Sequence, residues 1–273
     1  MIVALVVSTG LATGQESPAR CRLRLTSPLA NVKGRIDHFS VDVKDQRLFL
    51  GAVENHTLEV IDLKSSQRVH TIADLAEPQG VFYDPSTNRL FVACGLDGVT
   101  KIFDGTTYQV LATVKFPDDA DHIRYGSRSK GVIVGYAGAK QLRKREVGTG
   151  GLGFIDSDGK KTGDVVIDAH PESFQLEKAG SRIFVNVPDK KEIEVIDAVK
   201  RAVVARWAVS AEDNFPIAQN PCCRLVPKCL IRQHAKVRIL PAQKQLVVGK
   251  WSCAQERSMS LMGIYANSVL RTP

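Results

Sequence analysis

The sequence predicts an all-β fold assembled from one repeated unit of four short strands. Residues 47–62 (RLFLGAVENHTLEVID), 89–104 (RLFVACGLDGVTKIFD) and 182–197 (RIFVNVPDKKEIEVID) each run from an Arg to an Asp 15 positions later. A fourth copy, residues 130–156, carries 11 extra residues, and the copies start 42, 41 and 52 residues apart. A period of about 40–45 residues built from four strands is typical of a β-propeller blade. We therefore predict a β-propeller with about four recognisable four-stranded blades.

The first repeat shows how a blade is expected to divide into strands. Alternating apolar residues predict an inner strand over 38–43, and a short turn leads to the nearly continuous apolar strand 48–53. A second turn leads to a mixed strand over 57–63, and an outer strand follows over 69–75. The other repeats follow the same order.

Aspartates close the third strand of every repeat. Asp62, Asp104, Asp156 and Asp197 each follow two apolar residues and precede a polar turn. A carboxylate in this place accepts hydrogen bonds from backbone amides two residues further on. We predict that these four residues are structural.

The two ends of the repeat region suggest an incomplete ring. Residues 21–35 occupy the slot of an outer strand that would await partners from the C-terminal end, and residues 211–218 (AEDNFPIA) match the start of another blade. No further copy follows. We expect blades over 20–218 and a ring that is not closed, whose unpaired edges favour self-association.

Residues 219–273 form a basic, Cys-containing tail. Nine Lys or Arg face a single acid there, whereas 1–218 hold 28 of each sign, so the whole net charge of +8 comes from the tail. A reading-frame change in the gene would explain the abrupt loss of the repeat, and a genuine basic module is the alternative. Cys222, Cys223, Cys229 and His234 match no zinc-site spacing, and disulfides are favoured over a metal there.

Residues 1–19 resemble a signal peptide. An apolar run is followed by small residues, with Ala12 and Gly14 placed as in a cleavage site, although a buried first strand would show the same pattern. No other stretch approaches the roughly 20 apolar residues of a membrane-spanning helix. We predict an exported protein, periplasmic or extracellular, without a membrane span.

The repeats resemble a known family. The strings RLFLGAVENHTLEVID and RIFVNVPDKKEIEVID are similar to the YVTN repeat of YncE-like bacterial β-propeller proteins, in which an apolar strand leads to a "VID" strand. The resemblance covers about residues 20–218. It implies a propeller of about seven blades, mostly without an assigned catalytic activity.

Polar residues recur in the loops that enter the inner strands. Alignment of the repeats on Arg47, Arg89, Lys130 and Arg182 brings four short pairs to matching positions, with two histidines close by. Such loops surround the mouth of a propeller's channel, where they could contact a ligand or simply cap strand ends. The predicted ligand-binding residues are Asp37, His38, Gln79, Asp121, His122, His170 and Glu172, and the pairs are Asp37-His38, Gln79-Gly80, Ala120-Asp121 and Glu172-Ser173.

Two other motifs receive a structural interpretation. Residues 148–153 spell Gly-x-Gly-x-x-Gly, but a strand follows where a dinucleotide site needs a helix, so we predict a flexible hairpin. The adjacent cluster of Lys140, Arg143, Lys144 and Arg145 is interpreted as a solvated surface. Nucleic-acid or phosphate binding, there or at the tail, is the less favoured alternative.

These observations favour a binding or scaffold protein that contacts an unidentified protein or small ligand through its channel-mouth loops, without catalysis. The sequence assigns no catalytic residue, metal ligand or cofactor, and it lacks the Gly-x-Ser-x-Gly and His-Glu-x-x-His motifs. The alternative is a metal-dependent propeller enzyme of the lactonase or quinoprotein kind, using Asp37, His38, Asp121, His122 and Glu172. A truncated product without activity is the third possibility.

Overall fold

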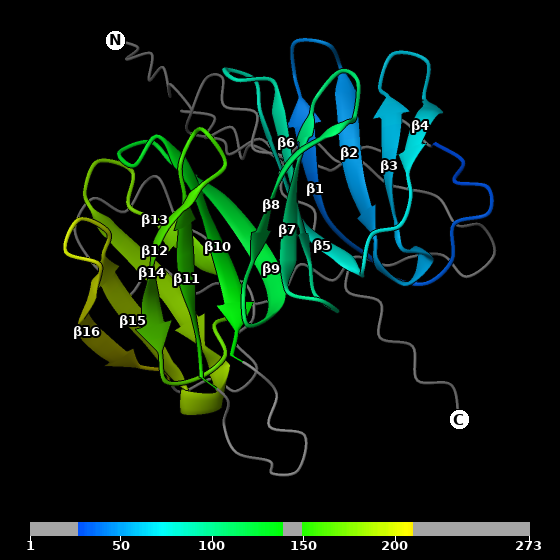
Figure 1. Ribbon diagram of the computed structural model, residues 1–273. Helices are drawn as coiled ribbons and strands as arrows, with labels where there is room; N and C mark the ends of the chain where they lie inside the picture. Colours follow the sequence, from blue (N-terminus) through cyan, green and yellow to red (C-terminus); the bar gives the residue numbers. More distant parts are fainter. Residues whose placement is uncertain (1–26, 139–148, 210–273) are drawn as a thin grey trace, which may run out of the picture.

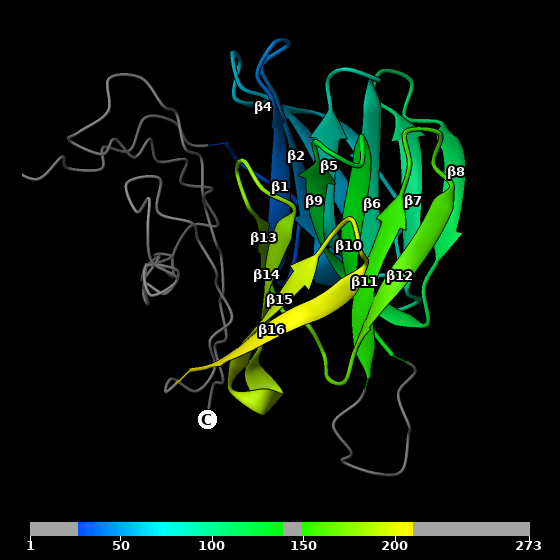
Figure 2. The same ribbon diagram turned by 90° about the vertical axis from the view of Figure 1, so that its left-hand side faces the viewer.

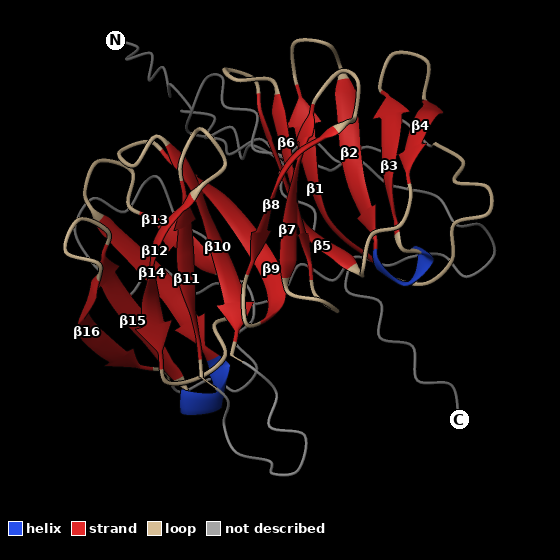
Figure 3. Cartoon of the chain, in the orientation of Figure 1, coloured by secondary structure: helices blue, strands red, loops and turns tan. Residues whose placement is uncertain are grey.

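A computed structural model describes residues 27–138 and 149–209 of the chain. Strands β1 to β16 form four antiparallel sheets of four strands, and in each sheet the strands lie in sequence order (Figure 1). Apart from the single-turn helices Val53–Asn55 and Pro188–Lys190, the described chain consists of strands and loops (Figure 3). The predicted all-β class and the four blades are confirmed.

The first two blades follow the predicted order of strands. The inner strand of the first blade ends at Asp42, so Val43, which we expected inside it, lies in the exposed turn. The strands of the first blade are β1 (Ile36–Asp42), β2 (Arg47–Ala52), β3 (Thr57–Asp62) and β4 (Gln67–Ile72). Those of the second are β5 (Pro78–Asp84), β6 (Arg89–Cys94), β7 (Val99–Asp104) and β8 (Val110–Lys115).

The third and fourth blades repeat this pattern with a short inner strand in the fourth. The third blade comprises β9 (Asp118–Gly126), β10 (Gly131–Ala137), β11 (Gly150–Ile155) and β12 (Lys161–Ile167). The fourth comprises β13 (Phe174–Leu176), β14 (Arg182–Val187), β15 (Glu192–Asp197) and β16 (Ala202–Ala208). In Figure 2 the outer strand β16 lies in front. The inner strands β1, β5, β9 and β13 contact one another in turn.

Apolar side chains hold neighbouring blades together. Phe49 of the first blade packs against Leu90 and Val92 of the second, and Phe91 of the second packs against Val132 and Val134 of the third. This repetition follows from the pleat, because alternate residues of the second strand face opposite neighbours. Each blade therefore contributes half of two cores.

The outward face of the fourth blade carries apolar side chains of the kind that pack between neighbouring blades elsewhere in the structure. Phe184, Ile193 and Val195 form a buried cluster there with Trp207 and Ala205 of the same blade, and no described blade packs on it. At the opposite end, Leu29 and Val32 cover the outward face of the first blade. The described blades do not close a ring.

The outer strand predicted over 21–35 does not form in its described part, residues 27–35. Residues 27–35 contain a single bridge residue, Pro28, and are otherwise irregular, with one turn and one bend. The described segment contributes packing instead, since Leu29 and Val32 lie against Leu48 and Leu50.

The aspartates at the strand ends have the predicted structural role. Oδ1 of Asp62 accepts hydrogen bonds from the amides of Lys64 and Ser65, and Asp104 binds the amides of Thr106 and Thr107 in the same way. Asp156 and Asp197 bind the amides of their own turns.

The glycine-rich segment is not a flexible hairpin, and that prediction is wrong for its described part. Gly150 to Gly153 lie in the buried strand β11, and a Cβ at Gly153 would overlap the ring of Phe116. The glycines make room for Phe116 and Tyr136, whose rings stack 5.0 Å apart. This strand replaces the helix that a dinucleotide site requires.

Several predictions concern residues that lie outside the described ranges. They are the signal-like segment 1–19, the basic cluster of Lys140, Arg143, Lys144 and Arg145, the blade start at 211–218 and the tail 219–273. Within the described residues, no helix has the length and apolar character needed to cross a membrane.

Candidate functional site

A β-bulge lies at the start of three inner strands, at the same place in each blade. In β1, Ile36 pairs with Ala52 and Phe39 pairs with Leu50, so two residues of β1 oppose the single Gly51. The same offset occurs in β5 between Pro78 and Val81, and in β9 between Ala120 and Ile123. A bulge of this kind bends the strand and re-aims its side chains. The residue pairs inside these bulges are Asp37-His38, Gln79-Gly80 and Asp121-His122.

The fourth blade places Glu172 and Ser173 at the corresponding position. The amide of Glu172 donates to the carbonyl of Asn186, and the amide of Asn186 donates to the carbonyl of Ser173. Both residues therefore oppose Asn186, just before β13 begins at Phe174. We call these four pairs the bulge pairs.

The bulge pairs correct the alignment of the third repeat by one residue. The sequence alignment on Lys130 matched Ala120-Asp121 to the other pairs, whereas the structure matches Asp121-His122. Val132 pairs with Ile155 as Leu48 pairs with Ile61, so Gly131 rather than Lys130 corresponds to Arg47. Lys130 has a φ of 49° and takes the left-handed turn position that Gln46, with a φ of 57°, takes in the first blade.

As a result, the first residue of every bulge pair carries an amide or a carboxylate: Asp37, Gln79, Asp121 and Glu172. Each comes from a different blade, and the inner strands of neighbouring blades contact one another. The repeat therefore brings four like-placed polar side chains to one end of the inner strands.

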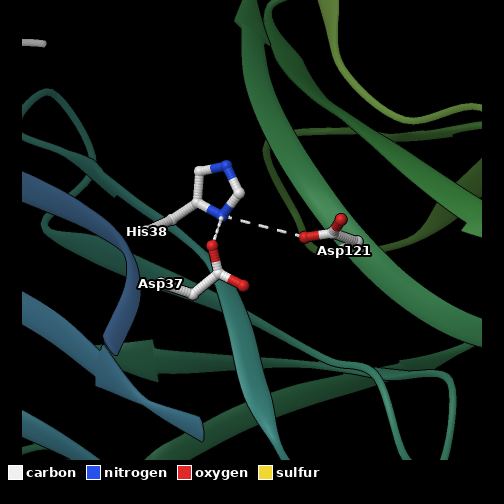
Figure 4. A group of neighbouring side chains, drawn as sticks. All are labelled: Asp37, His38 and Asp121. Carbon is white, nitrogen blue, oxygen red and sulfur yellow. Dashed lines mark ion pairs between the residues drawn. The ribbon is translucent and has the colours of Figure 1, made fainter. Parts of the chain in front are cut away.

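Asp37, His38 and Asp121 form one close group of side chains (Figure 4). Nδ1 of His38 lies 3.2 Å from Oδ1 of Asp37 and 3.7 Å from Oδ1 of Asp121. One ligand atom from each of the three lies within 4.8 Å of the others. Their side chains are 16–18% exposed, so the group is largely buried without being sealed.

Gly80 makes this approach between the first and third blades feasible. It occupies the second place of its bulge pair, where the first and third blades carry His38 and His122. A Cβ at this position would overlap the carbonyl oxygen of Asp121. The missing side chain lets the backbones of β5 and β9 lie close together at Asp121.

A chain of polar contacts links the remaining residues. Arg35 contacts Oδ2 of Asp37 at 2.8 Å and donates to Oε1 of Gln79 at 3.3 Å, and Gln79 donates to Oδ1 of Asp119 at 2.9 Å. His170 lies 3.8 Å from Asp119 through Nε2, and its Nδ1 lies 3.8 Å from Glu172. Contacts thus run from the first blade to the fourth without interruption.

His122 lies behind His38 and is almost completely buried. His122 is 1% exposed, and its ring packs edge to face on the ring of His38, with the two ring centroids 4.7 Å apart. Nε2 of His122 has no hydrogen-bond partner among the described residues. Burial and the nearby positive charge of Arg124 hold the pKa of His122 well below its usual range, so the ring is neutral.

The site holds more negative charge than it neutralises. Burial, together with the charges of Asp121 and Asp119, raises the pKa of Glu172 to about 7. Burial also raises the pKa of Asp121 to about 6, despite the opposing charge of His38. Burial disfavours the ionised form of Asp37 too, but its hydrogen bond to His38 and the charges of His38 and Arg35 lower its pKa overall. Carboxyl groups whose pKa values are pushed apart in this way are common at functional sites.

The structure thus brings all seven predicted residues to one region, in two groups. Asp37, His38, Asp121 and His122 form the first, and His170 and Glu172 form the second, with Gln79 between them through Arg35 and Asp119. Their role in ligand binding stays a prediction.

Arg35 and Asp119 also belong to the site, although the sequence did not mark them as candidates. Asp119 lies in the acidic run Asp118–Asp121, which could have drawn attention to it, but its φ of 38° and its place beside the bulge are not readable from the sequence. Nothing in the sequence singles out Arg35.

Comparison with known proteins supports the architecture. No protein-family profile matches the chain, and no curated protein does either. Among solved structures, the chain is similar to the hydrazine synthase of Kuenenia stuttgartiensis, with a TM-score of 0.56 and 16% identity. It is also similar to the β-propeller domain of Cps50 (Swd1) from Myceliophteria thermophila, with a TM-score of 0.53 and 12% identity.

The chain has a β-propeller fold. The similarity covers 67% of this chain and 58% of the hydrazine synthase chain, and 73% of this chain and 62% of the Cps50 domain. The chain therefore spans about three fifths of the propellers that it matches. At these identities the likeness concerns the fold alone, and function has to be argued from the site.

Proposed function

We propose that this propeller is a binding protein that holds a small, positively charged ligand at the bulge pairs. The observation that carries the proposal is the imbalance of charge there. Four carboxyl groups, those of Asp37, Asp119, Asp121 and Glu172, outnumber the basic side chains that lie directly against them in the described part of the chain, which are Arg35, His38 and His170. A ligand that brings positive charge would relieve this repulsion in a partly buried place, where charges interact strongly.

The wider setting is part of the same proposal. The RLF…VID repeats support membership of the YVTN, YncE-like group of exported propellers, and the signal-like segment 1–19 supports a periplasmic or extracellular location. In this setting the propeller acts without catalysis, and the bulge pairs contact the ligand.

Hydrogen exchange tests the proposal. The full chain, freed of metal with EDTA, is titrated with spermidine and, for comparison, with the dianion glutarate. We expect spermidine alone to slow amide exchange in β1, β5 and β9, with an effect that weakens as salt is added. Glu172→Gln and Asp119→Asn should reduce the protection, whereas Asp158→Asn, at an exposed turn far along the blade, should not. Equal protection by glutarate, or protection confined to other strands, would overturn the proposal.

A metal-dependent enzyme is the second candidate, and one observation favours it. Glu172 has a pKa of about 7 and lies 3.8 Å from Nδ1 of His170, which suits a group that exchanges protons near neutral pH. Lactone hydrolysis by the full chain, followed by proton release and abolished in Glu172→Gln, would support this candidate over simple binding.

A further inference from the structure

We propose that Asp37, His38 and Asp121 bind one divalent first-row transition metal ion of the Zn²⁺ type. This inference rests on the proposed function, since it names the cation that the bulge pairs hold. The three ligands come from the bulges of the first and third blades and meet across Gly80 of the second.

The donor atoms are already spaced for such an ion. Ligands about 2.0–2.2 Å from Zn²⁺ in tetrahedral geometry lie roughly 3.4 Å from one another. Oδ1 of Asp37 lies 3.2 Å from Nδ1 of His38, and Oδ1 of Asp121 lies 3.7 Å from it. The third separation, between the carboxylate oxygens of Asp37 and Asp121, is within 4.8 Å, so these two side chains need to approach each other by at most about 1.4 Å to complete three corners of a tetrahedron.

The chemistry of the donors selects the class of ion. Two carboxylate oxygens and one imidazole nitrogen suit Zn²⁺ and its neighbours, whereas Ca²⁺ and Mg²⁺ prefer oxygen ligands alone. His38 would bind through Nδ1, which is the nitrogen that faces both carboxylates. The remaining coordination positions are left for water or for a ligand of the propeller.

Two buried polar atoms, one belonging to Asp121 and one to the neighbouring His122, have no hydrogen-bond partner among the described residues. Oδ1 of Asp121, the atom that faces His38, is buried and accepts no hydrogen bond from the described residues. His122 is 1% exposed, its ring lies against that of His38, and its Nε2 has no hydrogen-bond partner in the described part of the chain. Buried polar atoms without partners are rare, and an ion with its water is a common explanation.

The surrounding charges are compatible with a dication. Arg35 pairs with Oδ2 of Asp37, so Oδ1 of Asp37 is available to the metal ion. The positive charge of Arg124 lies near His38 and His122. Asp119 and Glu172 add negative charge on the other side of the site. The competing arrangement is metal-free, with a protonated His38 held between Asp37 and Asp121 as an ion pair.

Metal titration of the full chain separates the two arrangements. After EDTA treatment and dialysis, Zn²⁺ is added in a calorimeter, the bound metal is counted by mass spectrometry, and Co²⁺ is used for visible spectra. We expect one equivalent that is lost, or weakened at least tenfold, in Asp121→Asn and in His38→Gln, with a changed Co²⁺ spectrum in the latter. The matched controls are Asp158→Asn and His70→Gln, whose side chains are exposed and outside the site, and they should bind as the wild-type chain does.

Other ligands in the chain do not obscure the result. An ion held by the cysteines of the tail would survive in both site variants, so a loss of one equivalent out of two still supports the proposal. If all metal binding survives in Asp121→Asn and His38→Gln, or if the wild-type chain binds none, the proposal is overturned. Circular dichroism checks the fold, and Asp37→Asn replaces any variant that does not fold.

The outcome also distinguishes this inference from the proposed function. If Zn²⁺ does not bind while spermidine still protects β1 and β9 from exchange, the metal inference fails alone. If neither binds at the bulge pairs, the proposed function fails with it.

Discussion

Gly80 provides the sharpest structural prediction, because its missing side chain allows β5 and β9 to lie close together at the site. A Cβ in Gly80→Ala would overlap the carbonyl oxygen of Asp121 and lie 2.9 Å from the carbonyl carbon. Non-bonded carbons normally stay about 3.5–4.0 Å apart, so this carbon alone requires a shift of about 0.6 Å, and the oxygen requires more. The backbones of β5 and β9 would have to separate.

The expected cost has a structural and a functional part. Inserting a methyl group into a packed region costs about 1–3 kcal/mol of unfolding free energy, which urea denaturation would measure. Metal ligands tolerate deviations of only about 0.2 Å, so the shift should also move Asp121 away from His38 and weaken Zn²⁺ binding at least tenfold.

Gly135 supplies a matched control in the strand opposite the bulge of β9. A Cβ there would lie 3.6 Å from the ring of Phe174 and 3.8 Å from Cβ of His122, which are ordinary contacts, and neither glycine has a φ in the left-handed region. Gly135→Ala should change stability by less than about 0.5 kcal/mol. If Gly80→Ala unfolds and binds Zn²⁺ as Gly135→Ala does, the close approach of β5 and β9 is refuted.

Three further predictions concern acidity and association. Burial opposes the ionised form of Asp42, but hydrogen bonds from Arg47 and from two backbone amides lower its pKa overall. The stability that these bonds contribute is therefore present above pH 3.8 and is lost as the pH falls below it. Asp42→Asn should lower the free energy of unfolding by about 1–3 kcal/mol at pH 7, and urea titrations should show a smaller loss of stability in acid than for the wild-type chain. Glu172 keeps its proton up to about pH 7 in the folded chain but loses it near pH 4.5 in the unfolded chain. The stability of the metal-free chain should therefore fall as the pH rises from 4.5 to 7. Glu172→Gln should abolish this fall, and at pH 8 it should be more stable than the wild-type chain by about 1–3 kcal/mol. The outward face of the fourth blade should support self-association, so Trp207→Lys should lower the sedimentation coefficient at high protein concentration, and an unchanged distribution would count against that face.

The architecture could be predicted from the sequence because the residues that stabilise a blade recur at the same positions in every repeat. The apolar run of each second strand reflects burial between two blades, and the closing Asp reflects the turn that its carboxylate stabilises. The same grammar also indicated which loop of each blade carries the polar pair.

The third repeat shows where sequence reasoning fell short. Lys130 was matched to Arg47 by charge, but backbone conformation decides the position, and Lys130 takes the left-handed turn place. The bulges could not be predicted either, because they depend on a register shift against Gly51, Ala93 and Gly135 rather than on the identity of the bulged residues. Only the structure shows that the bulge pairs face one region and that Gly80 lets two of them meet.

A single crystallographic measurement would test the central claim, that the bulge pairs form a cation site. Crystals of the full chain grown with Zn²⁺ would be measured on both sides of the zinc absorption edge. We expect an anomalous peak between Oδ1 of Asp37, Nδ1 of His38 and Oδ1 of Asp121, about 2.0–2.2 Å from each. A map without a peak there, in which His38 bridges the two carboxylates directly, would contradict it.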